Sequence, residues 1–255
     1  MTDFAWRCLI IVVTMSSSML CFVILRKVAR IDSEVWSIRK WFDEQLDAKL
    51  LTTYRQVEAL QALYSVLELG RPLPPLRRWA GSPDFLLQLA QLILKRRPEC
   101  IVECSSGAST LVIARCLQMI GSGRVFSLEH DEFYAKQTIQ LLCEHGVEGF
   151  ATVVIAPLRE TQTTEGSFLW YSQLDQLPES IDVLVIDGPP ANLGTLARYP
   201  AGPFLVAKLR PGGVALLDDA DRKDEREMVM RWRRQFPQLK ETYVEAEKGI
   251  LLLEH

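Results

Sequence analysis

Four short apolar segments between residues 101 and 217 are each followed by acidic residues, and helix-like stretches separate them. Glu103, Glu129, Asp187 and the pair Asp218-Asp219 follow the runs 101–102, 124–128, 181–186 and 213–217. Strands that alternate with helices predict an α/β fold with a parallel, doubly wound sheet. Ligands bind beyond the carboxyl ends of the strands in such sheets. The repeated acids therefore predict one functional site at that edge.

The first of these strands leads into a turn of small residues that opens a helix. Ile101–Thr110 reads IVECSSGAST, and an apolar helix is expected from Ala108 onwards. At such a turn a ligand can come close to the backbone at the positive end of the helix. Glu129 follows Gly107 at a spacing near the ~20 residues that separate a nucleotide-binding turn from a ribose-binding acid.

An antiparallel hairpin is predicted at the end of the chain. Strand-like runs over Leu239–Glu245 and Ile250–Leu253 flank the sequence Glu247-Lys248-Gly249, and a glycine in a short turn is typical of a hairpin. A terminal hairpin on a parallel sheet is unlike an ordinary dinucleotide-binding domain. The turn at 105–110 also lacks GxGxxG, so an NAD-dependent dehydrogenase is disfavoured.

These segments together resemble the class I S-adenosylmethionine (SAM) methyltransferases, over roughly Arg71–His255. The segments that resemble motif I, motif II, motif IV and the next strand with its loop are Ile101–Thr110, Leu128–Asp131, Ile181–Pro190 and Leu209–Asp219. Other stretches resemble a subgroup of bacterial O-methyltransferase-like proteins: Trp79–Leu87, Trp170-Tyr171, Arg198–Ala201 and Asp218–Arg222. The resemblance implies a Rossmann-like, mostly parallel sheet that ends in an antiparallel hairpin.

The resemblance also implies SAM as the cofactor. Glu103 would orient the polar groups of its methionine end, although this acid could instead cap the following helix. Glu129 would hold the ribose, and His130 either touches the adenosine or is a rim residue. Ser105 departs from the family because it adds a Cβ where the first glycine of the turn is usual. The expected cofactor residues are Glu103, Ser105, Ser106, Gly107, Ser109, Glu129, His130 and Asp187.

Three acids are candidates for a metal site and for catalysis. In catechol-type O-methyltransferases an Asp and a later Asp-Asn pair bind Mg²⁺, and the matching residues here are Asp187, Asp218 and Asp219. Oxygen ligands suit Mg²⁺ or Ca²⁺, and the metal would lower the pKa of an acceptor hydroxyl. Asp187 and Asp218 are the expected catalytic residues, with Asp187 as general base if no metal binds. Alternatively, Asp218 and Asp219 cap the helix near Lys223 and bond to Arg222.

The acceptor is only broadly indicated. The sequence lacks an NPPY-like motif, which mildly disfavours amide and base-nitrogen methylation and leaves a hydroxyl of a small-molecule, glycan or lipid-linked acceptor. Trp170, Tyr171, Arg198 and Tyr199 could line the acceptor pocket or pack at its edge. A net charge of −3 predicts no nucleic-acid partner. The six cysteines form no CxxC pair, which disfavours a zinc site or a disulfide framework.

The amino-terminal segment predicts a membrane anchor over residues 1–27. Cys8–Leu25 is uncharged, apolar and about long enough to cross a bilayer, while Thr14 and Ser16–Ser18 can bond back to the helix backbone. Basic residues follow it, which by the positive-inside rule places the rest of the chain in the cytoplasm. The prediction is a single-pass protein of the inner membrane. A cleaved signal peptide is disfavoured because no convincing cleavage site follows.

Residues 28–70 lack proline, and glycine occurs only at position 70, so a long helix is predicted there. Apolar residues recur in heptad spacing at Val28, Ile31, Val35, Ile38 and Phe42, and again at Val57, Leu60, Tyr64 and Leu67. One interpretation is a parallel coiled coil that makes a homo-oligomer through residues 28–69; the other is an amphipathic helix packed on the catalytic domain or on the membrane. Gly70–Pro75 is rich in breakers and predicts a domain boundary, with the methyltransferase-like domain at 71–255. A catalytically weak or silent scaffold at the membrane is the alternative function.

Overall fold

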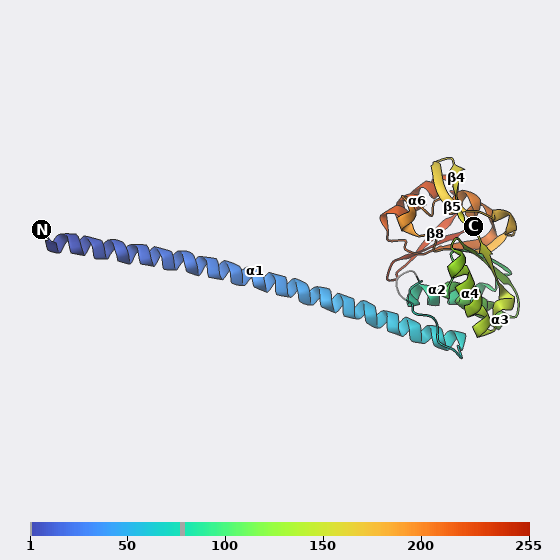
Figure 1. Ribbon diagram of the computed structural model, residues 1–255, viewed down its shortest axis with the longest axis horizontal. Helices are drawn as coiled ribbons and strands as arrows, with labels where there is room; N and C mark the ends of the chain where they lie inside the picture. The colour runs from blue at the N-terminus through green and yellow to red at the C-terminus, as the bar shows by residue number, and fades with distance from the viewer. Residues whose placement is uncertain (1, 77–79) are drawn as a thin grey trace. The chain divides into compact units, whose positions relative to one another are not determined.

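The computed structural model describes residues 2–76 and 80–255, and it divides the chain into two compact units, Met1–Tyr54 and Arg55–His255. Trp79, part of one O-methyltransferase-like stretch, lies outside the described residues. The first unit belongs to helix α1, Thr2–Leu67, whose last turns belong to the second unit. The second unit contains the sheet and the remaining helices (Figure 1).

Within the first unit, α1 exposes its apolar side chains along its whole described length. It contains a window of mean hydropathy 2.6, long and apolar enough by composition to cross a membrane. The hydroxyl of Thr14 donates to the carbonyl of Ile10 at 2.9 Å, and that of Ser16 donates to the carbonyl of Val13 at 2.9 Å. These bonds confirm the predicted return of the hydroxyls to the helix backbone for Thr14 and Ser16.

A seven-stranded sheet is the centre of the second unit, with the strand order β3-β2-β1-β6-β7-β9-β8. Five neighbouring strands are parallel, β9 is antiparallel to β7, and β8 is antiparallel to β9. The predicted mostly parallel sheet with a terminal antiparallel hairpin is confirmed. The strands are β1 Cys100–Cys104, β2 Arg124–Glu129, β3 Ala151–Ile155, β6 Ile181–Ile186, β7 Leu209–Leu217, β8 Lys240–Val244 and β9 Ile250–Glu254.

Both faces of the sheet are covered, which explains why the central strands read as continuous apolar runs. Ile101 and Val183 face a core shared with α2 and α3, whereas Val102 and Leu184 face a core shared with α6. Figure 1 draws α2, α3 and α4 on one side of the sheet, and α6 with the hairpin β4–β5 on the other. These elements are α2 Pro83–Arg96, α3 Ala108–Ile120, α4 Glu132–His145, α5 Ala201–Phe204, α6 Lys223–Gln235, β4 Leu158–Thr163 and β5 Gly166–Tyr171.

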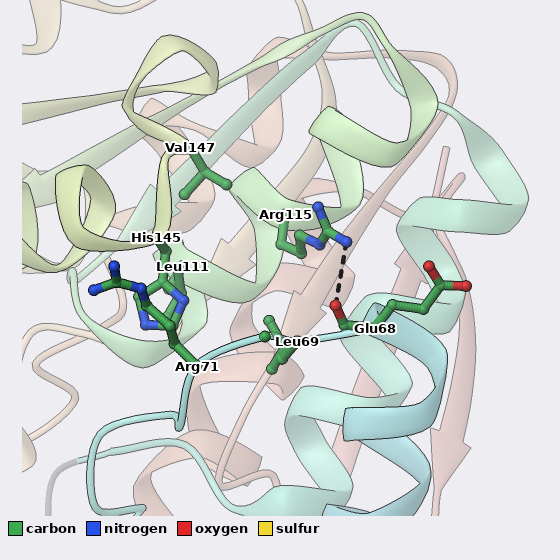
Figure 2. Close-up of a pocket in the computed structure, with 8 residues that line it drawn as sticks. Glu68, Leu69, Arg71, Leu111, Arg115, His145 and Val147 are labelled. Atoms are coloured by element: carbon green, nitrogen blue, oxygen red, sulfur yellow. Dashed lines mark hydrogen bonds between the residues drawn. The ribbon is translucent and has the colours of Figure 1, made fainter.

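The last turns of α1 pack on the sheet domain. Leu63 and Leu67 are fully buried in the core that α2 and α3 share. The Nε of Arg115 donates to the carbonyl of Leu67 at 2.9 Å, and its guanidinium also reaches the carbonyl of Glu68, beside a cavity of about 300 Å³ (Figure 2). These bonds satisfy carbonyls that a helix end leaves without partners. The compact unit consequently begins at Arg55, ahead of the boundary expected from the breaker-rich segment.

The hairpin β4–β5 is an element that the sequence did not predict. It forms a separate two-stranded antiparallel sheet, in which Leu158 pairs with Tyr171 and Thr163 with Gly166. Its first strand is polar and lacks a buried face, so it has no apolar alternation to recognise. Tyr171, the last residue of β5, borders the candidate site.

Candidate active site

The acids predicted to meet at the carboxyl edge of the sheet do lie there, around a cavity of about 210 Å³. Six of the predicted cofactor, metal and catalytic residues line this cavity: Ser105, Ser106, Glu129, His130, Asp187 and Asp219. The other lining residues are Tyr134, Tyr171, Pro190, Ala191, Arg198, Arg222 and Lys248. Among the described residues, the predicted Glu103, Gly107, Ser109 and Asp218 are not in this lining.

The turn after β1 places its backbone against the cavity at the cost of an unusual conformation. Ser105 has φ +106°, a region that side chains other than glycine rarely adopt. A Cβ added to Gly188 would lie 2.5 Å from the Tyr171 hydroxyl and 3.0 Å from the Cβ of Ser105, so only glycine fits there. Strain of this kind persists where the surrounding structure enforces it, often at functional sites.

Glu103 lies directly beneath this turn and is fully buried. Its Oε2 accepts hydrogen bonds from the hydroxyls of Thr110 and Ser127, both at 2.6 Å, and its Oε1 has no partner among the described residues. Burial raises the pKa of Glu103, although the hydroxyl donors oppose this. The side chain therefore links β1 to β2 and to the start of α3, below the cavity wall.

Glu129, at the end of β2, is fixed by donors on both oxygens. The Ser106 hydroxyl donates to its Oε2 at 2.9 Å, and the Asp131 N–H donates to its Oε1 at 3.0 Å. The Nδ1 of His130 lies 3.0 Å from the same Oε1. Burial alone would raise the pKa of Glu129, but these hydrogen bonds outweigh it and lower that pKa; the hydrogen bond to Glu129 raises the pKa of His130.

Asp187, Asp218 and Asp219 each offer a carboxylate oxygen, and these oxygens lie within 4.8 Å of one another. Burial raises the pKa of Asp187 to about 6, against the opposing charge of Arg198. Burial, followed by the charges of Asp187 and Asp219, raises the pKa of Asp218 to about 8. Asp219 has φ +61°, a conformation that Asp and Asn tolerate better than most residues.

Three cations compensate this acidic cluster. The Nη2 of Arg198 lies 2.9 Å from Asp219 Oδ2 and 3.3 Å from Asp187 Oδ1. Arg222 approaches Asp219 Oδ2 at 2.8 Å, and the Lys248 ammonium lies 3.7 Å from Asp219 Oδ1. The expected contact between Asp219 and Arg222 is therefore present. The alternative capping role is not, because α6 begins without a side-chain capping bond.

The cluster also offers oxygen ligands that a divalent cation could use. Asp218 Oδ2 and Asp219 Oδ1 are buried and have no hydrogen-bond partner among the described residues. Buried carboxylate oxygens are costly when unpaired, and oxygen donors are what Mg²⁺ and Ca²⁺ prefer. The residues thus fit a hard cation, although the guanidinium of Arg198 shares two of the same carboxylates.

The aromatic residues expected near an acceptor divide into two groups. Tyr171 lines the cavity, and its buried hydroxyl has no hydrogen-bond partner among the described residues. Arg198 also lines it. Trp170 and Tyr199 are fully buried in the core beside α6 and do not border the cavity in the described structure.

The cationic side of the site was missed by sequence reasoning. The sequence indicates Arg198 as a residue of the acceptor pocket and Lys248 as part of a hairpin turn, and neither position signals contact with the acids. Lys248 comes from the β8–β9 turn, whose Gly249 carbonyl accepts from the Ala220 N–H. The signal available for Arg198 was its charge within an apolar stretch. Its partners are distant in sequence, so the contact leaves no local pattern.

Comparisons with known proteins agree with this geometry. Residues 102–220 match a family model described as a methyltransferase domain. The O-methyltransferase TomG of Streptomyces achromogenes, solved with SAM, is 18% identical and covers 78% of this chain and 88% of its own, with a TM-score of 0.51. The methyltransferase PaMTH1 of Podospora anserina, solved with S-adenosylhomocysteine (SAH), is 14% identical and covers 75% and 86%, with a TM-score of 0.53.

A methyltransferase of Geobacter sulfurreducens is 16% identical, covers 79% of this chain and 89% of its own, and has a TM-score of 0.51. No curated protein matches the sequence. The strand order, the terminal antiparallel hairpin and the family match point the same way. The segment 102–220 is therefore similar to a methyltransferase domain, and the unit that carries the candidate site has the fold of the class I SAM-dependent methyltransferases.

Proposed function

We propose that the protein is a SAM-dependent methyltransferase that transfers a methyl group to a hydroxyl. One observation carries this proposal: the strained turn at Ser105, the fixed carboxylate of Glu129 and the acidic cluster around Asp187 all border one cavity. TomG and PaMTH1, which share the fold, were solved with SAM and SAH. SAM fits this arrangement, because the turn can bind the carboxylate of its methionine end while the acid binds its ribose.

Glu129 would accept hydrogen bonds from the ribose hydroxyls of SAM. Its pKa is lowered by its donors, so it remains an ionised acceptor at neutral pH. Ser105, Ser106, Gly107 and Ser109 would provide the turn for the methionine end, with Glu103 supporting it from below. The cavity is smaller than the ~300–1,000 Å³ of most small-molecule pockets, so we expect exposed rim residues such as Tyr134 to move when SAM binds.

In the proposed reaction the acceptor oxygen attacks the methyl carbon of SAM. A carbon–oxygen bond forms, the carbon–sulfur bond breaks, and SAH leaves with the sulfur electron pair. The hydroxyl proton passes to Asp187, whose pKa of about 6 suits a base that works near neutral pH. Asp218 lies buried beside it, and its pKa, raised to about 8, leaves it protonated near neutral pH, so that Asp187 is the base of the pair.

A divalent cation is a further candidate component. Asp187, Asp218 and Asp219 would hold it, and when bound it would polarise the acceptor hydroxyl. Arg198, Arg222 and Lys248 already balance much of the charge of these acids, so we expect the affinity for Mg²⁺ to be weak.

Calorimetric titration of full-length, detergent-solubilised protein with SAM tests the proposal. We expect binding by the wild type and a loss of at least ~10-fold with Glu129→Gln, because a neutral amide accepts less strongly from two hydroxyls. Glu99→Gln is the matched control: this acid lies before β1, at the opposite edge of the sheet, and accepts from Ser122. Absence of SAM binding in the wild type would contradict the enzyme and favour the silent scaffold.

We also propose that residues 1–27 anchor the protein in the inner membrane, with the catalytic domain in the cytoplasm. The support is the exposed apolar surface of α1 and its window of mean hydropathy 2.6, followed by basic residues. An acceptor attached to a membrane lipid or a glycan, or a small molecule used near the membrane, would suit that location.

Residues 28–50 are proposed to associate with the same region of a second chain. Val28, Ile31, Val35, Ile38 and Phe42 are all exposed and recur at heptad spacing. Chemical crosslinking of the full-length protein should give a dimer or a higher oligomer. Serine at Ile31, Val35 and Ile38 together should abolish that product, whereas unchanged crosslinking would exclude this surface.

A further inference from the structure

Arg198 is the most deeply buried of the three cations at the site. Its side chain is 5% exposed, and its guanidinium donates to three backbone carbonyls, those of Pro189, Asp187 and Asp218. Each of these carbonyls belongs to a loop that follows β6 or β7. The guanidinium is therefore held by the backbone as well as by acids, and it cannot leave the cluster by a simple change of rotamer.

The same guanidinium contacts the acids that would hold a divalent cation. Its Nη2 bridges Asp187 and Asp219, and its Nη1 lies 3.7 Å from Glu225. Without a cation, carboxylates this close would repel one another and separate, because like charges in a buried site are costly. Arg198 supplies the missing positive charge within the chain itself.

Arg198 does not satisfy the whole cluster. Asp218 Oδ2 and Asp219 Oδ1 remain buried and without hydrogen-bond partners among the described residues. Arg222 and Lys248 are more exposed, and the Lys248 ammonium stays 3.7 Å from Asp219. Two carboxylate oxygens are thus left for an additional cation, next to a fixed positive charge that repels it.

We propose that Arg198 is the resident cation of the Asp187–Asp218–Asp219 cluster. It keeps the three acids assembled when no divalent cation is present, and by the same charge it weakens the binding of one. This inference rests on the cation site of the proposed function, and it makes Arg198 a positioning residue. Removal of the Arg198 charge should therefore lower the stability of the metal-free protein and raise its affinity for a divalent cation.

Arg198→Gln in the full-length, detergent-solubilised protein tests the inference. We expect the melting temperature to fall without metal and to recover in part with millimolar MgCl₂, since Mg²⁺ replaces the lost charge. Electron paramagnetic resonance with Mn²⁺ should show a gain in affinity of at least ~10-fold over the wild type. Neither readout requires methyl transfer.

Arg210→Gln is the matched control. Arg210 pairs with the buried Asp182 at 2.6 Å, at the opposite end of β6 from the cluster. Its loss should lower the melting temperature with no recovery in MgCl₂ and no gain in Mn²⁺ affinity. Equal recovery in both variants, or no gain in Mn²⁺ affinity with Arg198→Gln, would overturn the inference.

If Arg198→Gln folds only with Mg²⁺ present, the inference is supported. If it folds under neither condition, Arg222→Gln decides, because Arg222 is half-exposed and contacts the same Asp219 oxygen. A gain in Mn²⁺ affinity of about threefold supports the inference, and no gain overturns it. SAM titration of the wild type reports on the proposed function separately, since its failure leaves the thermal and Mn²⁺ results interpretable.

Discussion

Helix α1 passes through two kinds of surroundings. Within the unit Met1–Tyr54, Val35 and Phe42 are 56% and 59% exposed, whereas in the unit Arg55–His255, Leu63 and Leu67 are fully buried. Both pairs lie on an apolar stripe of a helix. The stripe shows which face avoids water but does not say what covers it. The second unit supplies that cover from its own chain, whereas for the first unit we propose that lipid and another chain supply it.

Removal of residues 1–54 should have the largest effect on this comparison. We expect full-length protein in the membrane fraction and the shortened protein in the soluble fraction, with SAM binding unchanged, because the second unit keeps its own core. Fractionation followed by calorimetry measures both. Membrane association of the shortened protein would place the anchor in the second unit, against the comparison.

Truncation of a single leucine should change the free energy of unfolding in one of the two surroundings and not in the other. Leu63→Ala removes a fully buried side chain and should lower the free energy of unfolding by about 2–5 kcal/mol. Leu46→Ala, on the same helix but 45% exposed, should leave the denaturant midpoint of the second unit unchanged. A comparable loss from Leu46→Ala would reveal a partner for that face within the protein.

Relief of backbone strain should give a smaller change of opposite sign. Ser105 holds φ +106° with a Cβ, so Ser105→Gly should raise the free energy of unfolding by about 1 kcal/mol. Ser37→Gly, in the exposed part of α1, should give no such gain because a helix interior disfavours glycine. Chemical denaturation checks both. A destabilised Ser105→Gly would mean that the Ser105 side chain contributes contacts worth more than the strain.

The pair formed by Glu129 and His130 should give the smallest effect, and one that depends on pH. A lowered Glu129 pKa stabilises the fold above the usual value of 4.5, and a raised His130 pKa stabilises it below the usual 6.5. The contribution of this pair to stability is thus greatest between pH 4.5 and pH 6.5. It is lost as pH falls through the lowered pKa or rises through the raised one.

Glu129→Gln should move the pKa of His130 back toward 6.5, measured by NMR titration of its ring protons. Glu34→Gln is the control in the first unit, because the exposed pair of Glu34 with Arg30 contributes little and its loss should leave stability unchanged. An unchanged His130 pKa in Glu129→Gln would show that the pair is not formed in solution.

Much of the sheet could be predicted because its strands carry local signals. β6 matches its predicted bounds, 181–186, and the terminal hairpin lies close to the expected runs. The polar strand β4 had no such signal, and its hairpin was missed. The heptad spacing from Val57 to Leu67 was compatible both with a coiled coil and with packing on the catalytic domain. In the structure, Leu67 packs against α2 and α3 and is part of the core of the second unit.

The alternation of strands with helices, and the acids that follow the strands, can be recognised from the sequence because both properties depend on neighbours along the chain. The sequence could therefore place Glu129, Asp187, Asp218 and Asp219 at one edge. Which cations meet these acids depends on the folding of distant segments onto one another. Arg198 reaches the carbonyls and carboxylates of loops that follow β6 and β7, and its charge acts through distances in space, which residue spacing along the chain does not record.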